Sequence, residues 1–195
     1  MSQFAFPKIH SFPPLYTKQP NTTVLNNQLE SWCDIILNYC QFYRITSLSP
    51  SGEPLHSQIE NLNFEQLPPL FENKAIERSV APEFMSTIFQ YLIHNKKRAE
   101  YIDPKRPELG VLVYWRTLTE WATKIYDYVN SSGQLGTILT IFELTNSEES
   151  AYPEELRNIE YNVLVRAIEN VLMKQGKAQI LMSEDGTQIG GVKIV

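Results

Sequence analysis

The segment Leu29-Glu30-Ser31-Trp32-Cys33-Asp34-Ile35-Ile36-Leu37-Asn38-Tyr39 has the apolar spacing of an amphipathic helix. Steps of three, four and three residues place four side chains on one helical face: Leu29, Trp32, Ile36 and Tyr39. The same residue types return 89 positions later, as Leu118, Trp121, Ile125 and Tyr128. Shared helix patterning explains a matched leucine or isoleucine, whereas matched Trp and Tyr positions favour an internal duplication.

We call each set of four residues a helical stripe. In both copies we expect the same order of elements, which begins with the helix that carries the stripe and continues with a strand, two helical segments and a hairpin. In the first copy these are a helix from Leu25, a strand Ile45–Leu48, helical segments Glu72–Ser79 and from Pro82, and a hairpin of 99–103 with 109–115. In the second they are a helix from Leu118, a buried strand Thr137–Leu144, a turn near 154–158, a helix 161–176, and a hairpin of 178–183 with 188–195. Three helices with a small sheet and a terminal hairpin describe a winged-helix domain.

The predicted fold is therefore α+β, with two tandem winged-helix domains packed end to end behind an extended proline-rich segment. We place that segment at 1–22, the first domain at 23–115 and the second at 116–195. The link at 115–117 is too short and too apolar for a flexible tether. Residues 53–70 are expected to form an insertion loop.

The proline-rich segment contains Ser11-Phe12-Pro13-Pro14-Leu15-Tyr16. Two prolines fix φ near the polyproline II value and remove two backbone donors, so we expect an extended rod rather than a helix or a central strand. A stiff rod with aromatic rings at both ends loses little entropy when it docks in an aromatic-lined groove of another protein. The spacing alone leaves open the alternative that this segment lies on its own domain.

Composition excludes several classes of protein. The chain has 195 residues, 43% of them hydrophobic, and a formal charge of −5. No apolar run reaches the roughly 18–20 residues of a membrane span, and no signal peptide is recognisable. Residues 111–195 carry 7 Lys+Arg against 11 Asp+Glu, a net charge of −4 that disfavours nucleic acid and favours a basic partner. We expect a soluble intracellular protein.

No motif predicts catalysis, a metal site or a cofactor. His10, His56 and His94 lie far apart and have no metal-ligand spacing with either cysteine. The basic cluster Lys96-Lys97-Arg98 ends a predicted helix, where the macrodipole already favours cations. Because winged helices often bind DNA, a nucleic-acid-binding regulator remains an alternative function, although the fold alone does not establish it.

Three stretches resemble a known family. Ser11–Asn21, Ser31–Ile36 and Ile141–Thr145 look like the small tandem winged-helix subunit of the ESCRT-II endosomal sorting complex, and the resemblance runs from about Phe12 to the C-terminus. In that family the proline-rich N-terminus docks into the two larger winged-helix subunits, and two copies of the small subunit flank one copy of each. The second domain engages the N-terminal helix of an ESCRT-III subunit.

The resemblance implies roles for particular residues. The larger subunits would be bound by one set, Phe12, Pro13, Pro14, Leu15 and Tyr16. The ESCRT-III subunit would be bound by residues of the strand in the second domain, Thr137, Leu139, Thr140 and Phe142. Some members carry a further Pro-Pro-x-Tyr upstream, where this chain has Pro7-Lys8-Ile9-His10 with Phe4 and Phe6 as possible substitutes.

The implied protein is a non-enzymatic subunit without a cofactor. It would be cytoplasmic, recruited to the endosomal membrane without inserting into it, and active in multivesicular-body sorting of ubiquitinated cargo. Pro13-Pro14-Leu15-Tyr16 also fits the Pro-Pro-x-Tyr ligand of WW domains, so a WW-domain-binding adaptor is a second alternative.

Overall fold

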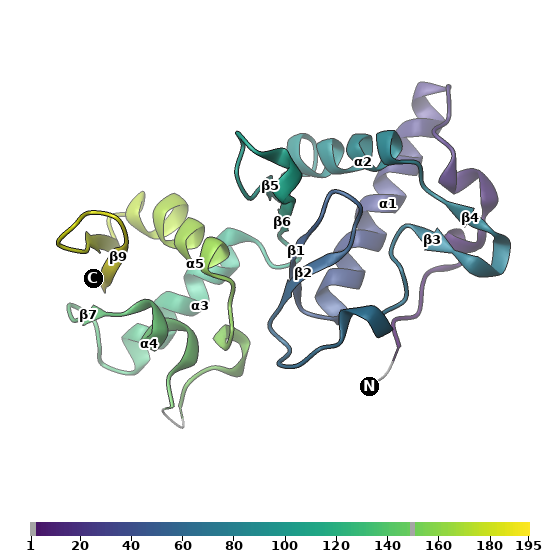
Figure 1. Ribbon diagram of the computed structural model, residues 1–195. Helices are drawn as coiled ribbons and strands as arrows, with labels where there is room; N and C mark the ends of the chain where they lie inside the picture. The colour runs from purple at the N-terminus through teal and green to yellow at the C-terminus, as the bar shows by residue number, and fades with distance from the viewer. Residues whose placement is uncertain (1–2, 149–150) are drawn as a thin grey trace. The chain divides into compact units, whose positions relative to one another are not determined.

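The computed structural model describes residues 3–148 and 151–195 of the chain (Figure 1). The chain divides into two compact units, Met1–Trp115 and Arg116–Val195. The fold is α+β, and each unit combines helices with a small antiparallel sheet in a winged-helix arrangement.

Two helices frame the first unit. The α1 helix spans Thr22–Phe42, and the Asn21 side chain caps it by accepting the Val24 N–H at 3.1 Å. The α2 helix spans Pro82–His94 and begins with proline, whose missing N–H costs nothing in the first turn. Both helices confirm the spacing-based prediction.

The sheet of the first unit has four strands in the order β2-β1-β6-β5. The strands are β1 Ile45–Leu48, β2 Pro54–Ser57, β5 Ala99–Tyr101 and β6 Val111–Val113. β5 and β6 form the predicted hairpin, with Ala99 opposite Val113. Residues 53–70 are not a simple loop, because they contain β2 and a 3₁₀ turn at Phe64–Gln66.

The predicted helix over Glu72–Ser79 is wrong. That segment forms a short hairpin of β3 Glu72–Asn73 and β4 Arg78–Ser79 around a 3₁₀ turn, Lys74–Ile76. The Asn73 side chain accepts the Ala75 N–H at 3.1 Å and starts the turn. Glu77 then adopts the left-handed conformation at φ 53°, which ends any helical course and reverses the chain.

The second unit opens with the predicted helix, α3 Leu118–Ser131, which begins with a capping box between Thr117 and Glu120. A 3₁₀ turn at Glu154–Leu156 and the α5 helix Tyr161–Ala167 follow, and α5 continues as a π-helix over Ile168–Met173. The sheet has the order β7-β9-β8, with strands β7 Ile138–Leu139, β8 Ala178–Met182 and β9 Ile189–Ile194. β8 and β9 form the predicted C-terminal hairpin.

The predicted buried strand Thr137–Leu144 is also wrong. Only β7 is extended, and the α4 helix Ile141–Asn146 follows directly. Thr140 Oγ1 accepts the Glu143 N–H at 3.2 Å, and the Glu143 carboxylate accepts the Thr140 N–H at 2.7 Å. This second capping box satisfies two donors of the first helical turn and outweighs the β-branched composition of the segment.

The duplicated stripe occupies equivalent positions in the two units. Trp32, Ile36 and Tyr39 of α1 are fully buried, and Trp121, Ile125 and Tyr128 of α3 form the matching centre of the second core. Leu29 is buried, whereas its counterpart Leu118 is half-buried. The same four residue types thus organise both cores.

Candidate functional site

The leader, defined here as residues 3–20, folds onto the first unit and is not an extended rod. It contains two 3₁₀ turns, Lys8–Ser11 and Pro13–Tyr16. Pro13 starts the second turn, where its fixed φ suits helical geometry and no N–H is required. The Thr17 N–H closes that turn on the carbonyl of Pro14 at 3.3 Å.

The inward side of the second turn belongs to the core. Leu15 and Tyr16 are each 3% exposed, and the Tyr16 ring stands edge-on to Trp32 with centroids 5.4 Å apart. The Tyr16 hydroxyl donates to the carbonyl of His10 at 2.7 Å. Burial raises the pKa of Tyr16 to about 12, so the hydroxyl remains a donor.

Two side chains of α1 hold this turn through its backbone. The Gln28 side-chain amide lies 3.0 Å from the carbonyl oxygen of Pro14, 2.9 Å from that of Leu15 and 2.8 Å from that of Thr17. Its two hydrogens are therefore shared among three acceptors. Trp32 Nε1–H donates to the same Leu15 carbonyl at 3.0 Å. We call this pair the Gln28–Trp32 clamp.

His10 is enclosed beside the clamp. It is 4% exposed, and its ring stacks on Phe6 with centroids 3.9 Å apart and contacts Tyr16 and Trp32 edge-on. Burial lowers the pKa of His10, so the ring is neutral at neutral pH. The Asn73 side chain donates to the His10 carbonyl at 3.0 Å and ties the leader to β3.

The outward side of the leader is apolar and exposed. Phe12 is 55% exposed, and both prolines after it are exposed as well. A shallow hollow of about 300 Å³ lies between the leader and the first turns of α1, with Ile9, Phe12, Pro14 and Val24 among its lining. We call these four residues the outer face of the leader, to which α1 contributes Val24.

Phe4 and Phe6 secure the start of the leader. Phe4 packs edge-on against Tyr39 and Phe42, and its backbone N–H donates to the Tyr43 hydroxyl at 2.8 Å. Both phenylalanines are half-buried. Their substitution for an upstream Pro-Pro-x-Tyr contact stays a prediction.

The residues predicted in the second unit have different surroundings. Phe142 is 64% exposed on α4, Thr137 is exposed, and Thr140 is the exposed cap of α4. Leu139 is only 5% exposed and belongs to the core. Sequence reasoning did not select Ile138, which is 62% exposed. Its side chain covers Gly191, and a Cβ added to Gly191 would lie 2.5 Å from Ile138 Cγ2.

Sequence reasoning also missed Gln28, Ile9 and Val24. A signal for Gln28 was present, because it lies four residues before Trp32 and therefore on the apolar face of α1. A polar side chain on a buried stripe needs a hydrogen-bonding partner, and here the partner is the leader backbone. Nothing in the sequence separates the exposed Ile9 and Val24 from core residues.

The described residues offer neither a metal-binding group nor a helix that could cross a membrane. No three His, Cys, Asp or Glu side chains among residues 3–148 and 151–195 come together as a metal-binding group. In the same ranges no helix has the length and hydropathy needed to cross a membrane.

Two winged-helix units preceded by a folded proline-rich leader define a tandem winged-helix subunit. A family model described as ESCRT-II complex subunit matches residues 9–160. Vacuolar protein-sorting-associated protein 25 of Danio rerio is 31% identical over 183 residues, covering 94% of this chain and 95% of the relative. The Drosophila melanogaster protein of the same name is 31% identical over 193 residues and covers 99% of both chains.

Solved structures agree with the sequence relatives. The crystal structure of subunit VPS25 of the endosomal trafficking complex ESCRT-II superposes with a TM-score of 0.77 at 27% identity, over 97% of this chain and 98% of that one. A chain of the crystal structure of the endosomal complex ESCRT-II (VPS22/VPS25/VPS36) gives 0.76 at 26% identity over the same shares. The chain belongs to the family of ESCRT-II complex subunits, within the group of vacuolar protein-sorting-associated protein 25.

Proposed function

We propose that this ESCRT-II subunit joins its complex through the leader and acts as a non-catalytic adaptor in endosomal sorting. The partners would be the two larger winged-helix subunits, with two copies of this chain per complex. The related crystal structure contains VPS22 and VPS36 together with VPS25. The observation that supports docking through the leader is Phe12, a large aromatic side chain that is 55% exposed on a rigidly held turn.

The five leader residues predicted to bind the larger subunits would have two different roles. Phe12, Pro13 and Pro14 face outward and supply contact area, while Leu15 and Tyr16 fix the turn to the first unit. A surface ordered before binding loses less conformational entropy on association. The clamp thus favours docking without touching the partner.

The folded conformation of the leader disfavours its binding by a WW domain. A WW domain binds the Pro-Pro-x-Tyr motif as a polyproline II helix. Here Tyr16 is 3% exposed and its hydroxyl is bonded within the leader. Binding would first require Leu15 and Tyr16 to leave the core, and that cost makes the larger ESCRT-II subunits the better partners.

For the second unit we propose a contact with the N-terminal helix of an ESCRT-III subunit. Phe142 would provide the central apolar contact, with Ile138 four residues before it in the chain and Thr137 and Thr140 at its edge. Leu139 would support this surface from the core. Residues 116–195 carry 7 Lys+Arg against 11 Asp+Glu, so the unit suits a basic helix and repels nucleic acid.

Two such units in one complex would raise the effective concentration of binding sites at an endosomal surface. The chain would therefore work in the cytoplasm and reach the endosomal membrane with its complex.

Co-expression with the two larger subunits tests the leader as the docking element. Phe12→Asp places a carboxylate on the outer face and should abolish co-purification, while the thermal midpoint of the free chain stays within about 2 °C of wild type. Leu55→Asp is the matched control, because Leu55 is 47% exposed on β2 of the same unit. Normal assembly of Phe12→Asp would refute the proposal.

A further inference from the structure

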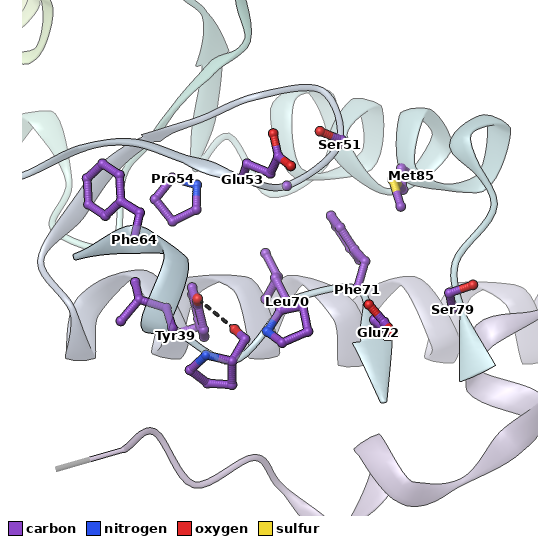
Figure 2. Close-up of a pocket in the computed structure, with 14 residues that line it drawn as sticks. Tyr39, Ser51, Glu53, Pro54, Phe64, Leu70, Phe71, Glu72, Ser79 and Met85 are labelled. Carbon is purple, nitrogen blue, oxygen red and sulfur yellow. Dashed lines mark hydrogen bonds between the residues drawn. The ribbon is translucent and has the colours of Figure 1, made fainter. Parts of the chain in front are cut away.

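The first unit has a second depression, lined by both polar and apolar side chains, that the leader does not form. A hollow of about 340 Å³ lies between the loop at 51–54 and the segment 64–72 (Figure 2). Its lining includes Leu70 and Phe71, each 3% exposed, and Met85 from α2.

The walls of this hollow are fixed by short contacts. The Tyr39 hydroxyl donates to the Pro68 carbonyl at 2.9 Å, the bond drawn as a dashed line in Figure 2. Gly52 has a φ of +83°, and a Cβ on it would lie 2.4 Å from the ring of Phe71. Ser49 Oγ accepts the Glu53 N–H at 3.1 Å and stiffens the turn above. The surface is preformed, which lowers the entropic cost of binding.

A second hollow of about 440 Å³ adjoins the first. The two share Ser51 and Met85, and the second extends over Phe89, Tyr101 and Val111. We call the two hollows together the Ser51 groove. Two shallow hollows joined at one turn suit an extended peptide segment better than a small molecule, which binds in a single enclosed cavity.

The charge of the groove is of one sign. Its charged lining residues are Glu53 and Glu72 in the first hollow and Glu108 in the second, all exposed. No ion pair between described residues uses any of the three. Residues 1–110 contain 10 Lys+Arg, yet none of these lines the groove. Arg106 lies close enough to Glu108 for the two charges to interact, so the negative charge of the groove comes mainly from Glu53 and Glu72. A groove with such carboxylates beside apolar side chains is complementary to an apolar segment that carries cations.

We propose that the Ser51 groove binds a segment of a partner protein that carries Lys or Arg beside its apolar side chains. Nucleic acids and anionic lipid surfaces are excluded as occupants, because the carboxylates repel phosphate. This site is separate from the outer face of the leader, so it can fail or succeed independently of assembly with the larger subunits.

A random dodecapeptide display, panned on the full chain, tests the proposal. Two matched triple variants measure how much the carboxylates of the groove contribute to peptide binding. Glu53→Gln with Glu72→Gln and Glu108→Gln removes the groove carboxylates, and Glu65→Gln with Glu77→Gln and Glu83→Gln removes three exposed carboxylates that do not line the groove. Ser51→Trp fills the junction of the two hollows.

We expect enriched peptides to combine apolar residues with Lys or Arg. An enriched peptide should bind the groove triple variant about tenfold more weakly than wild type, since each exposed pair contributes about twofold to threefold. It should bind the control triple variant normally and lose binding to Ser51→Trp. The proposal is overturned if no peptide is enriched, if enriched peptides are acidic, or if they bind the groove triple variant and Ser51→Trp as tightly as wild type.

Discussion

Replacing Gln28 by leucine tests the origin of the leader's conformation. Leucine branches one carbon earlier than glutamine but remains a large apolar side chain, and it removes the amide that contacts the carbonyls of Pro14, Leu15 and Thr17. The helix propensity of leucine is as good as that of glutamine, so α1 itself is not weakened. Any loss of stability therefore reports on the leader.

The structure sets the size of this loss. The Leu15 carbonyl keeps the Trp32 donor at 3.0 Å, and the Thr17 carbonyl keeps the Gln19 side-chain donor at 2.8 Å. The Pro14 carbonyl keeps the Thr17 N–H at 3.3 Å. No carbonyl acceptor is left wholly unpaired, although the Gln19 N–H loses the Gln28 Oε1 that accepts it at 3.3 Å. Each contact with a leader carbonyl therefore costs its net value of about 1 kcal/mol rather than a full desolvation penalty. Gln28→Leu should lower the free energy of unfolding by about 2 to 3 kcal/mol.

Urea unfolding followed by tryptophan fluorescence measures this change, because Trp32 lies in the clamp. The control is Gln41→Leu at an exposed position of the same helix, expected within about 0.5 kcal/mol of wild type. A double-mutant cycle with Tyr16→Ala adds a second test. Once that change has loosened the leader, Gln28→Leu should cost little more, and fully additive losses would contradict coupling through the leader. A single-variant loss below about 0.5 kcal/mol would refute the clamp.

Four further outcomes are expected. Tyr16→Ala should destabilise the first unit by about 3 to 5 kcal/mol in urea unfolding, because a 3% exposed aromatic side chain leaves a cavity, and a neutral effect would contradict its burial. Gly52→Ala should cost more than Gly176→Ala, which also has positive φ but meets no atom within 4 Å, and equal urea midpoints would contradict the contact with Phe71. Acidification from about pH 7.5 to about pH 5 should destabilise wild type more than His10→Phe. Burial lowers the pKa of His10 in the folded state, so below the ordinary pKa of 6.5 the unfolded chain binds a proton that the folded chain does not, and stability decreases as the pH is lowered. Equal pH dependence of the two urea midpoints would count against this. Phe142→Asp should abolish binding of a synthetic ESCRT-III N-terminal helix in a calorimetric titration without changing stability, whereas Tyr161→Asp, at another exposed aromatic position of the second unit, should bind normally.

The α1, α2, α3 and α5 helices and the terminal hairpins of both units were predictable because their signals are local. Apolar side chains at helical spacing, a first-turn Pro82, the Thr117 capping box and the Asp185-Gly186 turn each specify an element within a few residues. The same kind of signal was available at Thr140 and Glu143, where the β-branched composition of the segment misled the prediction.

The leader was not predictable in this way. The two prolines restrict φ equally in a polyproline II rod and in the first turn of a 3₁₀ helix. The choice between them depends on Gln28 and Trp32, which lie 11 to 17 residues beyond the carbonyls that they bind, and on Asn73. The sequence of the leader itself gives no sign of these tertiary hydrogen bonds, and Gln28 shows only that α1 needs some polar partner. Leu15 and Tyr16 were therefore assigned to a partner, although they belong to the core.

The mass of the complex purified after co-expression with the two larger ESCRT-II subunits tests docking through the outer face of the leader most directly. Wild type should give an assembly with two copies of this chain, and Phe12→Asp should leave the chain alone at its own mass of 22.5 kDa. An assembly of unchanged mass with Phe12→Asp would show that the complex is held by another surface.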